Sequence, residues 1–154
     1  MSQVERGAEQ FTHRFAVEAD LHHVERIFDQ FDREVGWVRR PSILEGIERE
    51  QLMVSEVDGT IIAAALIYHR LDKQTTIYSI AVDRWCHGWG TGRSLLDFIS
   101  TISRERGQRV IRAKCRVGEK ANLFWEKTGF TIHSVQQSKF STLNLWVRPI
   151  EGAS

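Results

Sequence analysis

Three glycines that alternate with other residues, Gly88, Gly90 and Gly92, constrain this chain more than any other feature. They follow an apolar, β-branched run that stops at Asp83, and a helical pattern of apolar residues begins directly after them. In a strand–glycine turn–helix arrangement, the N–H groups of the first helical turn have no partner within the helix. The glycines beside them have no side chains that would keep a ligand away from the backbone. The positive end of the helix dipole lies there as well, so we predict that the turn binds a phosphate group.

The spacing of this turn excludes two common nucleotide-binding loops. A P-loop needs a glycine where this chain has His87, and a lysine where it has Arg93. The dinucleotide pattern G-x-G-x-x-G also fails, because Arg93 or Leu95 stands where its third glycine belongs. What remains is the spacing His87-x-x-Gly90-x-Gly92 after a strand.

A second motif lies one helix and one strand further along the chain. Residues 121–130 read ANLFWEKTGF, in which Lys127 falls in the last turn of a helix and Gly129 is placed to end it. Together the two motifs resemble the GNAT superfamily of acyl-CoA-dependent N-acyltransferases. In that family a loop [QR]-x-x-G-x-[GA] holds the pyrophosphate of CoA, and a helix A-x-x-[LF]-Y-E-K-x-G-F packs along its pantetheine arm. His87 departs from the usual glutamine or arginine.

The resemblance implies acetyl-CoA as cofactor and assigns its contacts residue by residue. These are Ala81, Val82, His87, Gly88, Trp89, Gly90, Thr91, Gly92, Arg93, Asn122, Phe124, Trp125 and Lys127. A sub-group of phage and prophage acetyltransferase-like proteins is also similar around Lys114-Cys115 and residues 121–125, which leaves a nucleobase acceptor open.

Apolar periodicity and turn signals predict the order β-α-α-β-β-β-α-β-α-β-β. Asp20 is expected to cap the first helix, Gly36 to end it, and Asp58-Gly59 to form a hairpin turn. The predicted strands are 15–17, 51–57, 60–69, 75–82, 109–116, 130–136 and 142–147, and the predicted helices are 21–35, 42–49, 91–105 and 119–127.

This order is similar to that of the GNAT fold. The resemblance implies a mixed α/β (α+β) architecture with a mostly antiparallel sheet of about seven strands and about four helices, splayed between the fourth and fifth strands. We expect a single domain over residues 1–154, with flexible segments at 1–12 and 150–154.

The amino-acid composition limits the kinds of partner that the protein is expected to bind. Apolar residues make up 42% and charged residues 27% of the chain, which is ordinary for a globular domain, and the net charge of +1 gives no general attraction for nucleic acid or membranes. The apolar run Ile61 to Tyr68 is too short to cross a bilayer and the N-terminus lacks a signal sequence, so we expect a cytoplasmic protein, monomeric or homodimeric. Cys86 and Cys115 have no metal-ligand spacing, so no metal is expected.

One basic cluster stands out against this balance. Two interpretations stay open: a solvated helix end with an exposed strand edge, or a site for CoA phosphates or an anionic partner. Its members are Arg104, Arg106, Arg109, Arg112, Lys114, Arg116 and Lys120.

The residues that usually handle protons in the family are missing here. The motif tyrosine is Trp125, whose indole donates a hydrogen bond but no proton, and the fourth and fifth strands offer no glutamate base, with Ala113 at the usual place. The resemblance places the backbone N–H that polarises the thioester at about Val82. Tyr78, Cys115 and Trp125 are the candidate catalytic residues.

Two functions therefore remain. The chain is either an N-acetyltransferase that passes an acetyl group directly to a primary amine, or a CoA-binding sensor or partner module without catalysis. By resemblance, a small-molecule or peptide acceptor would enter near Trp37, Arg39 and Arg40. A hidden base would come from His22, His23 or His69.

Overall fold

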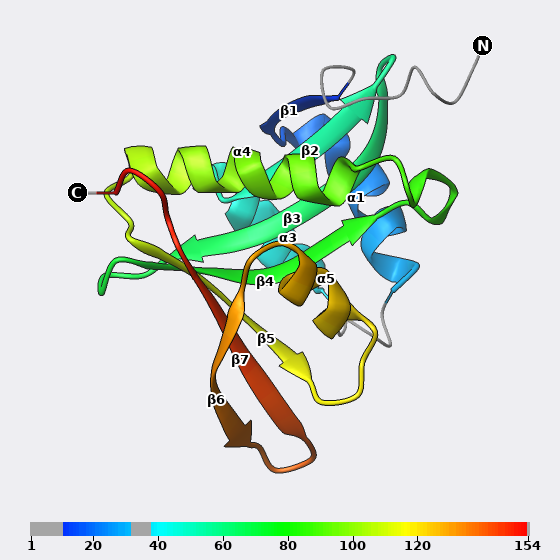
Figure 1. Ribbon diagram of the computed structural model, residues 1–154. Coiled ribbons are helices and arrows are strands. Elements are labelled where there is room, and N and C mark those ends of the chain that lie inside the picture. The colour runs from blue at the N-terminus through cyan, green and yellow to red at the C-terminus, as the bar shows by residue number, and fades with distance from the viewer. Residues whose placement is uncertain (1–10, 32–37, 154) are drawn as a thin grey trace. The chain divides into compact units, whose positions relative to one another are not determined.

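The structure is a computed structural model that describes residues 11–31 and 38–153. Its strands form a seven-stranded sheet in the order β1-β2-β3-β4-β5-β7-β6 (Figure 1). The strands are β1 (Thr12–Phe15), β2 (Leu52–Val57), β3 (Thr60–His69), β4 (Gln74–Val82), β5 (Val110–Arg116), β6 (Thr131–Gln137) and β7 (Thr142–Pro149). Within the described ranges the α-helices are α1 (Leu21–Asp29), α3 (Arg40–Glu48), α4 (Thr91–Glu105) and α5 (Ala121–Lys127). The predicted mixed α/β fold is confirmed.

The chain divides into two compact units. Residues up to 67 together with 79–99 form the first unit, and residues 68–78 together with those from 100 onward form the second. Strand β4 and helix α4 contribute residues to both. None of the helices in residues 11–31 and 38–153 is both long and apolar enough to cross a membrane.

The core of the first unit forms where α1 and α3 meet β2 and β3. Val24, Ile27 and Phe28 of α1 recur at helical spacing and are buried, as the sequence predicts. They pack with Ile43 of α3 and Leu52 of β2 in one apolar cluster. The apolar stripe of α1 therefore fixes this helix against the sheet.

The hairpin between β2 and β3 follows directly from its turn residues. Asp58 and Gly59 both have positive φ angles, 51° and 78°. A two-residue turn of this kind matches the twist of antiparallel strands. The predicted hairpin is confirmed.

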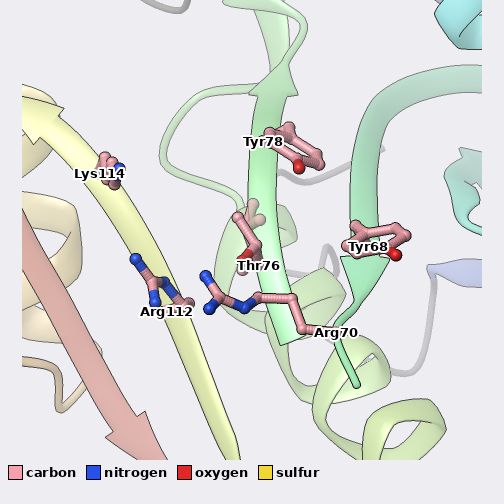
Figure 2. Close-up of a pocket in the computed structure, with 7 residues that line it drawn as sticks. Tyr68, Arg70, Thr76, Tyr78, Arg112 and Lys114 are labelled. Carbon is pink, nitrogen blue, oxygen red and sulfur yellow. The ribbon is translucent and has the colours of Figure 1, made fainter. Parts of the chain in front are cut away.

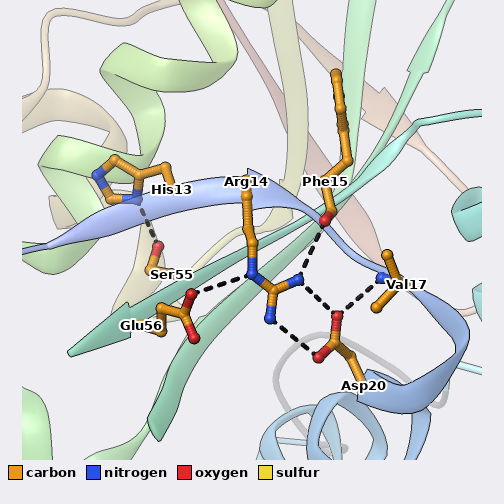
Figure 3. A network of polar contacts seen from close by, with 7 residues as sticks. All are labelled: His13, Arg14, Phe15, Val17, Asp20, Ser55 and Glu56. Carbon is orange, nitrogen blue, oxygen red and sulfur yellow. Dashed lines mark hydrogen bonds and ion pairs between the residues drawn. The ribbon is translucent and has the colours of Figure 1, made fainter. Parts of the chain in front are cut away.

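Asp20 does not cap α1, so that expectation is wrong (Figure 3). Its carboxylate accepts hydrogen bonds from the Val17 N–H at 2.8 Å and from both terminal nitrogens of Arg14 at 2.8 and 3.1 Å. Arg14 also donates from Nε to Glu56 of β2 at 3.1 Å. The hydrogen bond from Arg14 lowers the pKa of Asp20 despite its burial, so an ionised carboxylate ties β1 to the turn before α1.

Several predicted boundaries shift. β1 begins at Thr12 instead of Phe15, and α1 ends at Asp29; Gly36 and residues 32–35 of the predicted helix lie outside the described residues. α3 begins at Arg40 rather than residue 42, because Pro41 suits the first turn of a helix. α5 begins at Ala121 rather than residue 119.

In the second unit, β5 lies between β4 and β7. Residues Gln74–Ile77 of β4 pair in parallel with Val110–Ala113, and β5 pairs antiparallel with β7 along its length. The pairing ends at Ile77 and Ala113, which agrees with the predicted splay of the fourth and fifth strands. Over Val110–Ala113 both edges of β5 are paired, so the interpretation as an exposed strand edge does not hold for this part of the strand. Lys114 and Arg116, further along β5, are exposed.

Candidate functional site

Asp83 directly follows β4 and precedes the glycine turn. Its carboxylate accepts from the Trp85 N–H at 3.1 Å and from Arg26 of α1 at 3.0 Å. Burial acts to raise the pKa of Asp83, but the hydrogen bonds from Arg26 and the Trp85 N–H outweigh it and leave the pKa below its ordinary value. Asp83 thus stays ionised as a structural anchor and is poorly suited to act as a base.

Residues 87–93, here named the phosphate loop, have the backbone that an anion needs. Gly88 and Gly90 have φ angles of 87° and 84°, where a side chain would be strained, and a Cβ added at either meets no heavy atom within 4 Å. The N–H of Ser94 donates to the Gly90 carbonyl at 3.0 Å as the first helical bond of α4. The N–H groups of residues 91–93 precede that bond, so they have no acceptor within the helix.

Thr91 gives a second indication of a ligand-binding site. The residue is 2% exposed, and its hydroxyl oxygen is buried without a hydrogen-bond partner among the described residues. A buried hydroxyl without a partner is costly, so an acceptor atom from a ligand would stabilise it. The open glycine backbone, the first turn of α4 and this hydroxyl fit a pyrophosphate.

His87 is exposed and held in place at the start of the loop. Its ring stacks on Phe31 with centroids 5.7 Å apart, and Nε2 lies 2.9 Å from the Val82 carbonyl oxygen. A carbonyl only accepts, so Nε2 carries the proton, and the neutral ring keeps Nδ1 as an acceptor. Donation to a phosphate as well would require the doubly protonated ring.

The two tryptophans of the loop region differ in role. Trp89 packs against a small apolar cluster that includes Phe11, Ile62 and Cys86. This packing anchors the phosphate loop. Trp85 is 89% exposed. From the sequence, both tryptophans are predicted to flank the phosphate-binding turn. In the structure Trp89 is held by apolar packing, whereas the side chain of Trp85 is exposed.

In the second unit, Asn122 is the polar centre of the α5 motif. Its Nδ2 donates to the carbonyls of Arg116 and Glu119 at 2.9 and 2.8 Å. Its Oδ1 accepts from Asn144 Nδ2 at 3.1 Å and from Trp146 Nε1 at 2.8 Å. All hydrogen-bonding capacity of the amide is used, so the side chain holds the β5–α5 connection to β7.

Trp125 is a packing residue in the described geometry. It is 5% exposed, and its ring meets Phe124 and Phe130 edge-to-face with centroids 5.0 Å apart in both pairs. Such pairs add about 0.5–1.5 kcal/mol to the burial of the rings.

Trp125→Phe should therefore leave turnover within about tenfold, because at most one neutral hydrogen bond of about 0.5–1.5 kcal/mol is lost. Trp125→Tyr, which restores the tyrosine of the family motif, should match or exceed the natural chain. The measurement is kcat alongside acetyl-CoA affinity. A thousandfold drop in the Phe variant with affinity intact would show that the indole takes part in the chemistry.

A cavity of about 320 Å³, here named the basic pocket, opens in the second unit where β4 and β5 diverge (Figure 2). Tyr78, a predicted catalytic residue, lines it and is 62% exposed. The lining residues are Tyr68, Arg70, Thr76, Ile77, Tyr78, Arg112 and Lys114. Tyr68 and Arg70 were not predicted; the period-two alternation of Arg112 and Lys114 on β5 was the available signal.

Two of the other proton-transfer candidates, Cys115 and His69, are poorly suited to act near neutral pH. Burial raises the pKa of the Cys115 thiol, which therefore stays protonated. Burial and the Arg106 cation lower the pKa of His69 to about 4, and its Nδ1 pairs with Thr75 Oγ1 at 3.0 Å. His22 and His23 are exposed on α1.

Two of the predicted acceptor residues, Arg39 and Arg40, lie in the first unit. Arg40 donates from Nε and a terminal nitrogen to Glu25 of α1, at 2.9 and 2.8 Å. This bidentate pair joins α3 to α1 and occupies the guanidinium. Arg39 precedes α3, and Trp37 lies outside the described residues.

Comparison with known proteins decides the family. The model of the acetyltransferase (GNAT) family matches residues 14–130. The chain belongs to the GNAT family. It is an N-acetyltransferase with acetyl-CoA as cofactor, as the resemblance implied.

Solved structures agree with this fold. Ard1 from Thermoplasma volcanium is 24% identical with a TM-score of 0.80, covering 92% of this chain and 98% of that one. The ribosomal-protein-S18-alanine N-acetyltransferase from Escherichia coli is 19% identical with a TM-score of 0.76, covering 94% and 96%. The protein yncA from Salmonella typhimurium, solved with its cofactor acetyl-CoA, is 22% identical with a TM-score of 0.75, covering 93% and 95%. A search of curated proteins gave no match.

Proposed function

We propose that the protein transfers the acetyl group of acetyl-CoA directly to a primary amine of low basicity, and that the phosphate loop holds the pyrophosphate of the cofactor. The N-terminal position of the loop at the first turn of α4, the open backbone of Gly88 and Gly90, and the unpartnered Thr91 hydroxyl support the cofactor site. From the resemblance, Phe124, Trp125 and Lys127 are proposed to line the pantetheine arm.

Acetyl-CoA supplies an acetyl group already activated as a thioester. The N–H of Val82 is proposed to donate to the carbonyl oxygen, where negative charge develops during attack by the amine. His87 holds the carbonyl of the same residue, so we propose that it positions this part of β4. Positioning and backbone donation need no charged side chain.

The observation that carries the choice of acceptor is the missing base. Neither β4 (QTTIYSIAV) nor β5 (VIRAKCR) contains a carboxylate, and the basic pocket is lined by none. A lysine amine with a pKa near 10.4 costs about 4.6 kcal/mol to deprotonate at pH 7, whereas an α-amine near 7.7–8.0 costs about 1–1.4 kcal/mol. We infer a preference for α-amino groups, aromatic or nucleobase amines, or hydrazines.

The test is a pH profile of kcat/KM for two acceptors that differ mainly in the pKa of the amine. We expect each profile to rise with pH and to level off at the pKa of its own acceptor. The weakly basic amine should be preferred at neutral pH. If both profiles bend at the same pKa near neutrality, the enzyme carries a base, and His22 and His23 would be the first residues to replace.

A further inference from the structure

The basic pocket concentrates positive charge without enough negative charge to balance it. Arg70, Arg112 and Lys114 all line it, and none of its lining residues is acidic. Figure 2 shows Arg70 extending past Thr76 toward β5, the strand that carries Arg112. Like charges at such close quarters repel, so an anion between them would be stabilised.

Arg112 has unused hydrogen-bonding capacity. Its Nε is buried without a partner among the described residues, and a terminal nitrogen makes only a long contact of 3.4 Å with Gln74 Oε1. Burial and the charge of Arg70 lower the pKa of Arg112 from its ordinary value, although the guanidinium stays charged. A buried guanidinium N–H without an acceptor points to a ligand oxygen.

Arg70 is held in place at the opposite side of the pocket. Asp72 accepts from its Nε at 3.1 Å and from a terminal nitrogen at 2.8 Å. This pair fixes the guanidinium plane, and the charge of Asp72 acts on Arg112 as well. Asp72 therefore offsets part of the charge of these two arginines, and it does not itself line the pocket.

We propose that the basic pocket binds an oxyanion of the amine acceptor, a carboxylate or a phosphate. The planar forks of Arg70 and Arg112 suit two oxygens of such a group, Lys114 adds a point charge, and the hydroxyls of Tyr68 and Tyr78 can donate at the rim. The assignment to the acceptor rests on the proposed transferase function; anion binding does not.

The binding test titrates inorganic phosphate, and separately acetate, into acetyl-CoA-loaded protein, observed through the arginine Nε–H signals by NMR. Saturating shifts are expected for one or both anions. Arg112→Gln should weaken binding at least tenfold and Lys114→Gln should weaken it less, while Lys139→Gln, an exposed cation outside the pocket, should leave it unchanged. Shifts that do not saturate, or Arg70 shifts that keep their full affinity in the folded Arg112→Gln protein, overturn the proposal.

The transfer test compares peptide amides with the same free N-terminus and an aspartate, phosphoserine or asparagine at a later position. We expect kcat/KM to favour an anionic peptide at least tenfold over the asparagine peptide, the better of the two identifying carboxylate or phosphate. The preference should vanish in Arg112→Gln and persist in Lys139→Gln. Transfer without preference overturns the assignment to the acceptor but leaves the transferase intact. Absence of any transfer would instead count against the proposed function, and the phosphate titration would still decide whether the pocket binds anions.

Discussion

Replacing Gly92 with glutamate is expected to weaken acetyl-CoA binding at least about 100-fold while the protein stays folded. Gly92 lies in the first turn of α4, where the positive end of the helix dipole faces the proposed pyrophosphate. A carboxylate about 4 Å from a phosphate costs roughly 4 kcal/mol near a protein surface. The same carboxylate is favourable for the helix itself, because acidic residues suit helix N-termini.

Two variants at this position separate charge from bulk. Gly92→Gln keeps nearly the size of glutamate without its charge, so it should lose less affinity. Gly92→Ala adds only a methyl group to a helical residue, so of the three variants it should retain the highest affinity for acetyl-CoA. Isothermal calorimetry with acetyl-CoA gives the affinities and thermal melting gives the fold. Unchanged affinity in a folded Gly92→Glu protein would remove the loop from the cofactor site.

Asn122→Ala is expected to lower the free energy of unfolding by about 2–4 kcal/mol, because each hydrogen bond contributes about 0.5–1.5 kcal/mol. The substitution leaves Asn144 and Trp146, both buried, without their acceptor. The carbonyls of Arg116 and Glu119 lose their donor as well. The melting temperature should fall by about 5–15 °C in a calorimetric scan.

Asn122→Asp is the informative partner variant. Its carboxylate can still accept from Asn144 and Trp146, but it cannot donate to the two carbonyls, so its stability should lie between the natural chain and the alanine variant. Lys120→Ala, an exposed neighbour, should change stability by no more than about 0.5 kcal/mol. If Asn122→Ala melted like the natural protein yet bound acetyl-CoA poorly, the residue would act mainly on the cofactor.

Local signals in the sequence predict the fold well where they need no distant partner. The helix α4 was predicted over its observed range, and the Asp58-Gly59 turn takes the backbone that its residues favour. The role of Asp20 could not be predicted in this way, because its competing donor Arg14 is fixed by β1. A capping residue and an ion-pair partner look alike in sequence.

In the candidate site, too, only the features that depend on local sequence could be predicted. Glycine spacing predicts the phosphate loop, since its function depends on consecutive backbone groups. The hydrogen bonds of Asn122 reach residues more than twenty positions away, and the basic pocket combines three strand regions. Which residues come together in these two places depends on the register of the strands, and a single sequence does not specify that register.

The central claim, acetyl transfer from acetyl-CoA to a weakly basic amine, is tested most directly by mass spectrometry of a mixed amine panel incubated with protein and acetyl-CoA. We predict acetylated products among the α-amino and aromatic amines at neutral pH, and their loss with Gly92→Glu. Tight acetyl-CoA binding by the natural protein without any acetylated amine would contradict the claim, and would indicate a cofactor-binding module that does not catalyse transfer.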